Sequence, residues 1–162
     1  MKRRLLICLA ALAAAALVPP GAWADKPVTE RFVADESFEV PAGEICSFLL
    51  QFDFDQAGHI STFSDGRTVT HVRGTIEVTN GFTGESVSLH VGFSGVDTPL
   101  PNGDRRFTTQ GQSLLFYAAG DVLGPGLFLT KGHVVEIFDA TTGHITSSRL
   151  NGQRTDICAL LS

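Results

Sequence analysis

The chain has 162 residues and a formal net charge of −5; 43% of its residues are hydrophobic and 18% are charged. This length suffices for one domain with a hydrophobic core, and no linker or low-complexity stretch divides the sequence. The acidic balance disfavours nucleic acid and anionic lipid as partners.

Residues 1–24 have the features of a secretory signal peptide. Basic residues at the start precede an apolar run over residues 5–18, and small residues end the segment at Ala24. An apolar run of about 14 residues is shorter than the roughly 20 that a membrane-spanning helix needs. We therefore expect cleavage between Ala24 and Asp25, and export without a membrane span to the extracellular space or the cell envelope. A lipoprotein attached through Cys8 is disfavoured, because this cysteine comes before the apolar run is complete.

Removal of this signal takes three basic and no acidic residues, which leaves nine basic against seventeen acidic residues and a formal charge of −8. Two cysteines remain, Cys46 and Cys158. In an oxidising compartment such a pair is expected to form one disulfide. Free thiols acting as metal ligands are disfavoured, because no histidine or aspartate lies at zinc-ligand spacing around either cysteine. The expected bond would tie the first long strand to the end of the chain.

Apolar and polar residues alternate through residues 45–55, which is typical of a strand with one buried face. The polar positions include Asp53 and Asp55, which are expected to face solvent. The apolar positions are Cys46, Phe48, Leu50, Phe52 and Phe54.

The segments 67–80 and 85–95 form the most regular expected hairpin, because turn length and hydrophobic pattern agree there. When the two strands pair around a four-residue turn at 81–84, Val78 faces Val87. The register is then fixed along the whole hairpin.

The rest of the chain reads as short strands separated by turns, without a helix after the signal. The dipeptides Asp65-Gly66 and Asn151-Gly152 are expected to form type I′ hairpin turns. Single glycines divide other segments, and we expect roughly nine to eleven strands in all. Besides one or two strands at the sheet edge within 25–44, the remaining strands are expected at 59–64, 105–110, 113–117, 127–130, 133–139, 144–150 and 153–159.

This order of strands predicts one all-β domain over residues 25–162. Turns that join neighbouring strands describe an antiparallel up-and-down meander, and we expect it to close into a barrel whose first and last strands pair. A β-sandwich in which the disulfide bridges two sheets is the alternative.

Five stretches of the chain together resemble a known group of sequences. The group consists of small exported proteins of high-GC Gram-positive bacteria that have no assigned activity. The likeness covers nearly all of the chain after the signal, but it rests on turn and strand patterns. It implies export and a late cysteine; it implies no reaction and no functional residue. The stretches are 63–68, 78–80, 83–87, 114–116 and 155–161, which read FSDGRT, VTN, TGESV, LLF and TDICALL.

No motif for catalysis or cofactor binding is present. The sequence lacks the G-x-S-x-G and S-x-x-K patterns of nucleophilic enzymes. Asp53 and Asp55 could form a calcium site or a glycosidase pair, but their polar surroundings favour a solvated surface. His71 and His90 would lie more than about 10 Å apart along the strands, too far to share a zinc ion. We therefore expect no catalytic residue, no cofactor and no metal.

The candidate binding surface is a basic spot on the outer face of the best hairpin, formed by His71, Arg73 and His90. On a chain of charge −8, such a spot lets an acidic partner approach without general repulsion. Contacts through histidine should strengthen as the pH falls. A second set, Arg149 and Arg154 facing each other across the closing turn, is read as ordinary surface charge.

These observations predict a secreted, non-catalytic binding or surface-interaction protein. Its partner would be an unknown protein or small molecule. The alternative is a small β-barrel enzyme, an isomerase or hydrolase, that acts inside a calyx.

Overall fold

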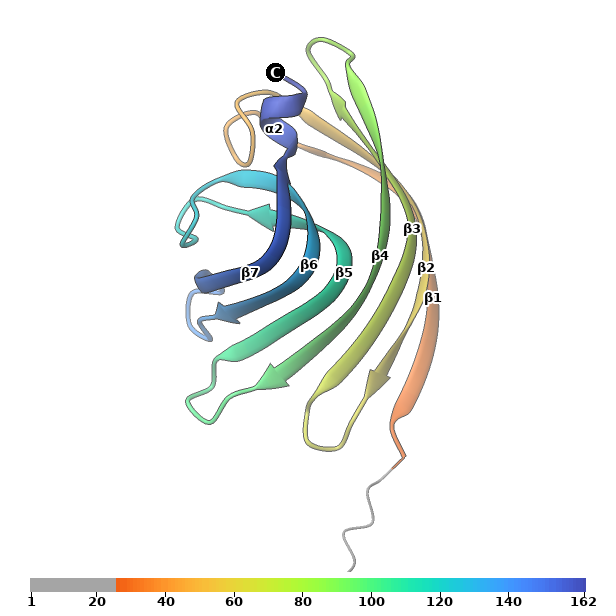
Figure 1. Ribbon diagram of the computed structural model, residues 1–162, viewed down its shortest axis with the longest axis vertical. Coiled ribbons are helices and arrows are strands. Elements are labelled where there is room, and N and C mark those ends of the chain that lie inside the picture. The colour runs from red at the N-terminus through yellow and green to blue at the C-terminus, as the bar shows by residue number, and fades with distance from the viewer. Residues whose placement is uncertain (1–25) are drawn as a thin grey trace, which may run out of the picture.

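Seven antiparallel strands form one sheet in which each strand pairs with the next along the chain. The computed structural model describes residues 26–162, so the expected signal peptide, its cleavage site and Cys8 lie outside the described residues. Figure 1 shows a curved wall of β1 to β4 and a tighter curl of β5 to β7, with the short helix α2 at the end of the chain. The elements are β1 (Val28–Val40), β2 (Leu50–Thr62), β3 (Thr68–Asn80), β4 (Ser86–Pro99), β5 (Arg105–Tyr117), β6 (Gly126–Phe138), β7 (Ile145–Asp156) and α2 (Ile157–Leu160).

The sheet is open, so the expected closed barrel is not supported. Within residues 26–162, β1 and β7 are the two edges of the sheet and do not pair with each other. The strands also belong to a single sheet, not to the two sheets of a sandwich. The reason for the open form is that β5 to β7 curl on themselves and so lead the last strand away from the first (Figure 1).

The expected count of nine to eleven short strands is wrong, because the strands are longer and fewer. Each has between 12 and 14 residues. Several glycines that resemble breaks in the sequence lie inside continuous strands as bends. In particular, Asn151-Gly152 lies within β7 and forms no hairpin turn. Arg149 and Arg154 therefore belong to the same strand and do not face each other.

A row of paired glycines makes the tight curl of β5 to β7. Gly111 pairs with Gly132, and Gly132 pairs with Gly152. At Gly132 the backbone has φ +138°, and a Cβ atom there would lie 2.3 Å from the carbonyl oxygen of Asn151. Only glycine tolerates this conformation and this approach. The three strands therefore bend sharply along the same line.

The first hydrophobic core lies where the two parts of the sheet face each other. Strands β4 and β5 pair only over residues 92–99 and 105–112, and they diverge beyond this stretch. The far end of β5 then packs across β2, and the ring centroids of Phe52 and Phe116 are 5.3 Å apart. The buried members of this core are Cys46, Phe48, Leu50, Phe52, Ile76, Val78, Leu89, Val91, Leu127, Ile157 and Leu161.

The structure confirms which residues of the segment 45–55 are buried and which are exposed. Cys46, Phe48, Leu50 and Phe52 are buried, while Asp53 is exposed. The strand itself begins only at Leu50, so the first two apolar residues enter the core from the bend before β2.

The end of the chain closes this core. As the sequence predicts, Cys46 and Cys158 lie at disulfide-bonding distance, with Cα atoms 5.5 Å apart. The side-chain amide of Asn80 donates a hydrogen bond to the carbonyl of Leu161 over 2.8 Å. The one-turn helix α2, which the sequence did not indicate, buries Ile157 completely. These contacts hold the last residues across the open end of the sheet.

A second core lies inside the curl of β5 to β7, and the β5–β6 loop covers it. Its buried residues are Leu115, Tyr117, Val134 and Ile145. In the loop, the carboxylate of Asp121 accepts hydrogen bonds from the backbone N–H groups of Ala118 and Ile145.

Burial raises the pKa of the Asp121 carboxyl, but these backbone hydrogen bonds and the ring of His144 outweigh burial and hold it below its usual value. The charged form of Asp121 therefore ties the loop to the start of β7.

The expected register of the β3–β4 hairpin is confirmed, since Val78 pairs with Val87. The turn at Asp65-Gly66 also exists, but it is not of type I′. That type requires positive φ at both central residues, and among the described residues only glycines have positive φ. The turn instead closes with a hydrogen bond from the Phe63 N–H to the Arg67 carbonyl, and Gly66 alone has φ +79°.

Candidate functional site

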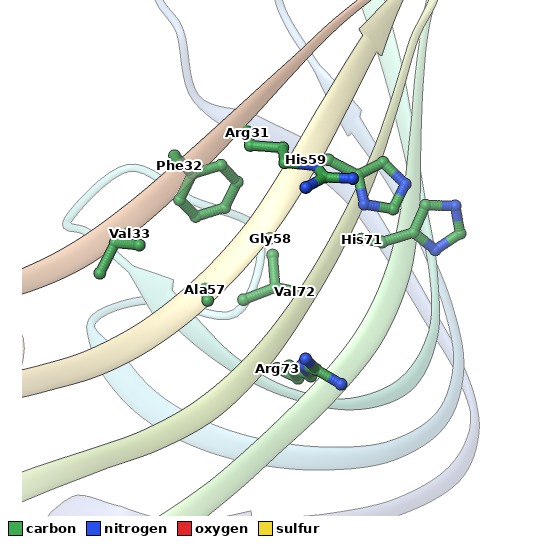
Figure 2. Close-up of a pocket in the computed structure, with 9 residues that line it drawn as sticks. All are labelled: Arg31, Phe32, Val33, Ala57, Gly58, His59, His71, Val72 and Arg73. Carbon is green, nitrogen blue, oxygen red and sulfur yellow. The ribbon is translucent and has the colours of Figure 1, made fainter.

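A groove of about 650 Å³ opens over the middle of β1, β2 and β3. Its charged lining comes from the outer face of these strands, the face whose side chains alternate with those of the core. Figure 2 shows basic side chains from three neighbouring strands around it. The lining residues are Arg31, Phe32, Val33, Ala57, Gly58, His59, His71, Val72 and Arg73.

Strand pairing brings three of the basic side chains into one row. Arg31 of β1 lies opposite His59 of β2, which lies opposite His71 of β3. The two imidazole rings have centroids 4.7 Å apart. Nδ1 of His71 is also 2.7 Å from the hydroxyl of Ser94 on β4, which fixes the orientation of that ring. The row is thus built by register across the sheet, from residues far apart in the chain.

Arg73 forms the second row of the groove, two positions along β3 from His71. It lies between Ala57 and Gly92, which are small enough to leave its side chain uncovered. Within residues 26–162, neither Arg31 nor Arg73 takes part in an ion pair. Both guanidinium groups therefore keep their hydrogen-bond donors available for a ligand.

Gly58 lies in the lining of the groove and is the close contact between β2 and its two neighbours. This residue pairs with Phe32, whose ring lies so close that a Cβ atom at position 58 would be 2.7 Å from it. The same Cβ atom would be 2.1 Å from the carbonyl oxygen of His71. A glycine here leaves room for the Phe32 ring on the core-side face of β2 and lets β2 and β3 approach closely. On the outer face, beside the basic groups, the apolar lining is Val33 of β1 and Ala57 of β2.

Two of the three residues of the expected basic spot line this groove. His71 and Arg73 do so, whereas His90 lies opposite Thr75 and outside the lining. Sequence reasoning missed Arg31 and His59, which complete the site. The turn between β2 and β3 could have pointed to His59, because the length of this turn decides which residue of β2 faces His71.

The chemistry of the lining suits binding. The lining residues carry no carboxylate, hydroxyl or thiol of their own, and the Ser94 hydroxyl contacts the lining through Nδ1 of His71. Two arginines can hold a carboxylate or phosphate through paired hydrogen bonds.

A second hollow, of about 540 Å³, lies at the end of the sheet where the β4–β5 and β6–β7 loops meet. The rings of Phe107 and Phe138 pack edge to face there, with centroids 6.5 Å apart. Its one arginine, Arg105, is already bound to Asp97, since Nε is 2.9 Å from both carboxylate oxygens. This cation is neutralised, so the hollow suits an anion less well than the groove does.

A buried polar group lies inside the curl of β5 to β7. The Tyr117 hydroxyl donates to the Glu136 carboxylate and lies 2.9 Å from the hydroxyl of Ser148. Burial raises the pKa of Glu136, and burial together with the hydrogen bond to Glu136 raises the pKa of Tyr117. Neither residue lines the groove or the hollow. Their polar atoms satisfy each other, so we interpret this group as structural.

Within the described part of the chain, no three histidine, cysteine, aspartate or glutamate side chains gather as metal ligands would. No helix among residues 26–162 is long and apolar enough to cross a membrane. No protein-family model, curated protein or solved structure matches this chain.

Proposed function

We propose that this is a secreted, non-catalytic binding protein that holds an acidic ligand in the groove of β1, β2 and β3. The observation that carries the proposal is the gathering of Arg31, His59, His71 and Arg73 around one groove on an acidic chain. Like charges are close together here, and no described acidic group pairs with either arginine. A bound anion would remove the repulsion between them.

The groove also indicates the kind of ligand. Val33 and Ala57 give it a small apolar wall on the same face as the basic groups. Burial of an apolar surface supplies affinity, and the arginines fix the position of the acidic group. We therefore propose a small molecule with an aromatic or aliphatic body and one carboxylate or phosphate group.

The alternative of a barrel enzyme has less support. A calyx enzyme needs a closed interior with a reactive acid or base that the substrate can reach. The sheet is open, and the buried Glu136 is bonded to Tyr117 and Ser148. Binding at the outer face needs none of these features.

The test uses the exported form of the protein, titrated with benzoate and, separately, with inorganic phosphate. Binding is followed by NMR through the ring C–H signals of His59 and His71. Arg73→Glu should weaken benzoate binding by at least about tenfold, because it reverses one ligand-binding charge.

Arg106→Glu is the matched control. It makes the same change of charge on an exposed arginine that lies outside the groove, and binding should change by less than about twofold. Equal weakening by both variants would show general electrostatics and reject the groove. Signals that respond to phosphate as strongly as to benzoate would reject the role of the apolar wall.

A further inference from the structure

Among residues 26–162, strand β1 is a free edge of 13 residues that lacks several of the usual protections against pairing. Proteins blunt such edges with charged side chains, lysine above all, and with proline, bulges or very short strands. The sequence of β1, VTERFVADESFEV, contains four acidic residues and one arginine but no lysine or proline, and its pairing with β2 runs without a bulge. Val33 on this strand is 77% exposed and Val28 is 65% exposed. The other edge, β7, is by contrast bent at Gly152.

We propose that β1 pairs antiparallel with β1 of a second copy of this chain, around a two-fold axis at Val33. Such a pair would satisfy the outward-facing backbone groups of both strands and join the two sheets into one. The two strands are identical, so the contact closes after two copies. This proposal does not require a ligand in the groove, although it engages Arg31, which also lines the groove.

Charge complementarity on the outer face selects this register. With Val33 opposite its own copy, Arg31 faces Asp35 of the second copy, and this pair occurs twice. Asp35 lies beside Asp55 within its own chain, and both aspartates are exposed. An incoming arginine would therefore relieve the repulsion of two neighbouring carboxylates.

Hydrophobic complementarity on the opposite face agrees with this register. Val28 faces Phe38 of the second copy, and these side chains are 65% and 42% exposed in the single chain. Phe32 faces Ala34. One like-charge pair remains, Glu30 opposite Glu36, and it also occurs twice. This pair opposes association, so the dimer should be weak and depend on concentration.

Other registers lose these matches. A register centred on Ala34 places Val33 opposite Asp35, and one centred on Phe32 places Arg31 opposite Val33. A register centred on Asp35 sets two Asp35 side chains against each other, next to two Asp55 side chains. Only the register centred on Val33 pairs Arg31 with Asp35.

The pairing would also bring two binding grooves together. Arg31 and Val33 line the groove and lie at the proposed axis. The grooves of the two copies would therefore meet across Val33, and Asp35 of the second copy would lie next to Arg31.

Sedimentation equilibrium of the exported form over a series of concentrations tests the proposal. The wild type should show a monomer–dimer equilibrium. Arg31→Glu and Asp35→Arg should each raise the dimer dissociation constant at least about tenfold, because each turns two attractive pairs into repulsive ones. The double variant Arg31→Glu/Asp35→Arg should restore it to within about threefold, since the pairs are attractive again.

A gain of affinity tests the register independently. Glu36→Lys should tighten the dimer about tenfold, because it converts both Glu30–Glu36 contacts into attractive pairs. Arg149→Glu, which changes a charge on the opposite edge β7, is the control and should leave the equilibrium unchanged. Circular dichroism should confirm that each variant is folded.

Three outcomes would overturn the proposal. These are a wild type that stays monomeric at every concentration, a double variant that fails to restore association, and association that weakens with Arg149→Glu but not with Arg31→Glu.

Discussion

The hydroxyl of Tyr117 donates a hydrogen bond to the carboxylate of Glu136, although these residues lie near opposite ends of the β5–β6 pair. Tyr117 pairs with Gly126 at one end of the two strands, and Glu136 pairs with Phe107 near the other. The contact is possible only because both strands fold back along the glycine row. It places an acidic group inside the smaller core.

Stability should therefore depend on the protonation of Glu136. Burial, together with the charge of Asp121, raises its pKa above the ordinary 4.5. The native state then binds this proton more tightly than the unfolded chain does. The stabilising contribution is fully present below about pH 4.5 and is lost as the pH rises through the raised native pKa.

Glu136→Gln removes this titration. Urea unfolding from about pH 4.5 to about pH 8 should show a smaller loss of stability in the variant than in the wild type. Tyr117→Phe should move the loss to higher pH, because the Tyr117 hydrogen bond lowers the pKa of Glu136. Identical pH profiles for wild type and Glu136→Gln would contradict this account.

The bend at Gly132 should be intolerant of a side chain. Gly132→Ala would place a Cβ atom 2.3 Å from the carbonyl oxygen of Asn151 at a φ of +138°. We expect the free energy of unfolding to fall by more than about 3 kcal/mol, because the substitution strains the backbone and forces apart two strands that are in close contact here. Gly92→Ala is the control, because nothing lies within 4 Å of its Cβ position. It should change stability by less than about 0.5 kcal/mol.

The bond between Cys46 and Cys158 should carry a large share of the stability. Its sequence separation is 112, so reduction frees a long loop in the unfolded chain. We expect reduction to lower the free energy of unfolding by about 2 to 5 kcal/mol. Denaturant curves with and without reductant measure this difference. Thiol titration of the denatured, unreduced protein should find no free thiol, and two titratable thiols would reject the pairing.

Two neighbouring residues of β2 test the orientation of the strand. Phe52 is 1% exposed, and Phe52→Ala should cost about 3 to 5 kcal/mol by leaving a cavity in the first core. Asp53 is exposed, and its carboxylate accepts a hydrogen bond from the hydroxyl of the exposed Ser37. Asp53→Ala should change stability by less than about 0.5 kcal/mol. Chemical denaturation of both variants gives the comparison, and a larger effect at Asp53 would mean that the wrong face is buried.

The sequence by itself determined the features that depend on neighbouring residues. The alternation of apolar and polar residues fixed that the side chains of Phe48 and Phe52 are buried, because successive side chains of an extended chain point to opposite sides. The turn between β3 and β4 fixed Val78 against Val87, because its length and the hydrophobic pattern allow one register. The two cysteines after residue 24 allowed one pair.

The tertiary structure alone decided the open sheet and the number of strands. The sequence does not distinguish a glycine that ends a strand from a glycine that bends a continuous strand. A Cβ atom at Gly132 would lie 2.3 Å from the carbonyl oxygen of Asn151 in β7. This close approach of a second strand, which the sequence does not reveal, distinguishes Gly132 as a bend within β6. Closure of the sheet also depends on contacts between distant parts of the chain, because the curl at this bend keeps β7 away from β1.

The set of residues that line the binding groove also depends on the register between strands and not on the local sequence alone. A type I′ turn at Asp65-Gly66 would pair Ser64 with Arg67 and place His59 opposite Val72. The actual turn pairs Phe63 with Arg67 and places His59 opposite His71. A shift of one residue moves every side chain of a strand to the other face. The sequence alone thus pointed to His71 and Arg73, whereas only the register between strands could add Arg31 and His59.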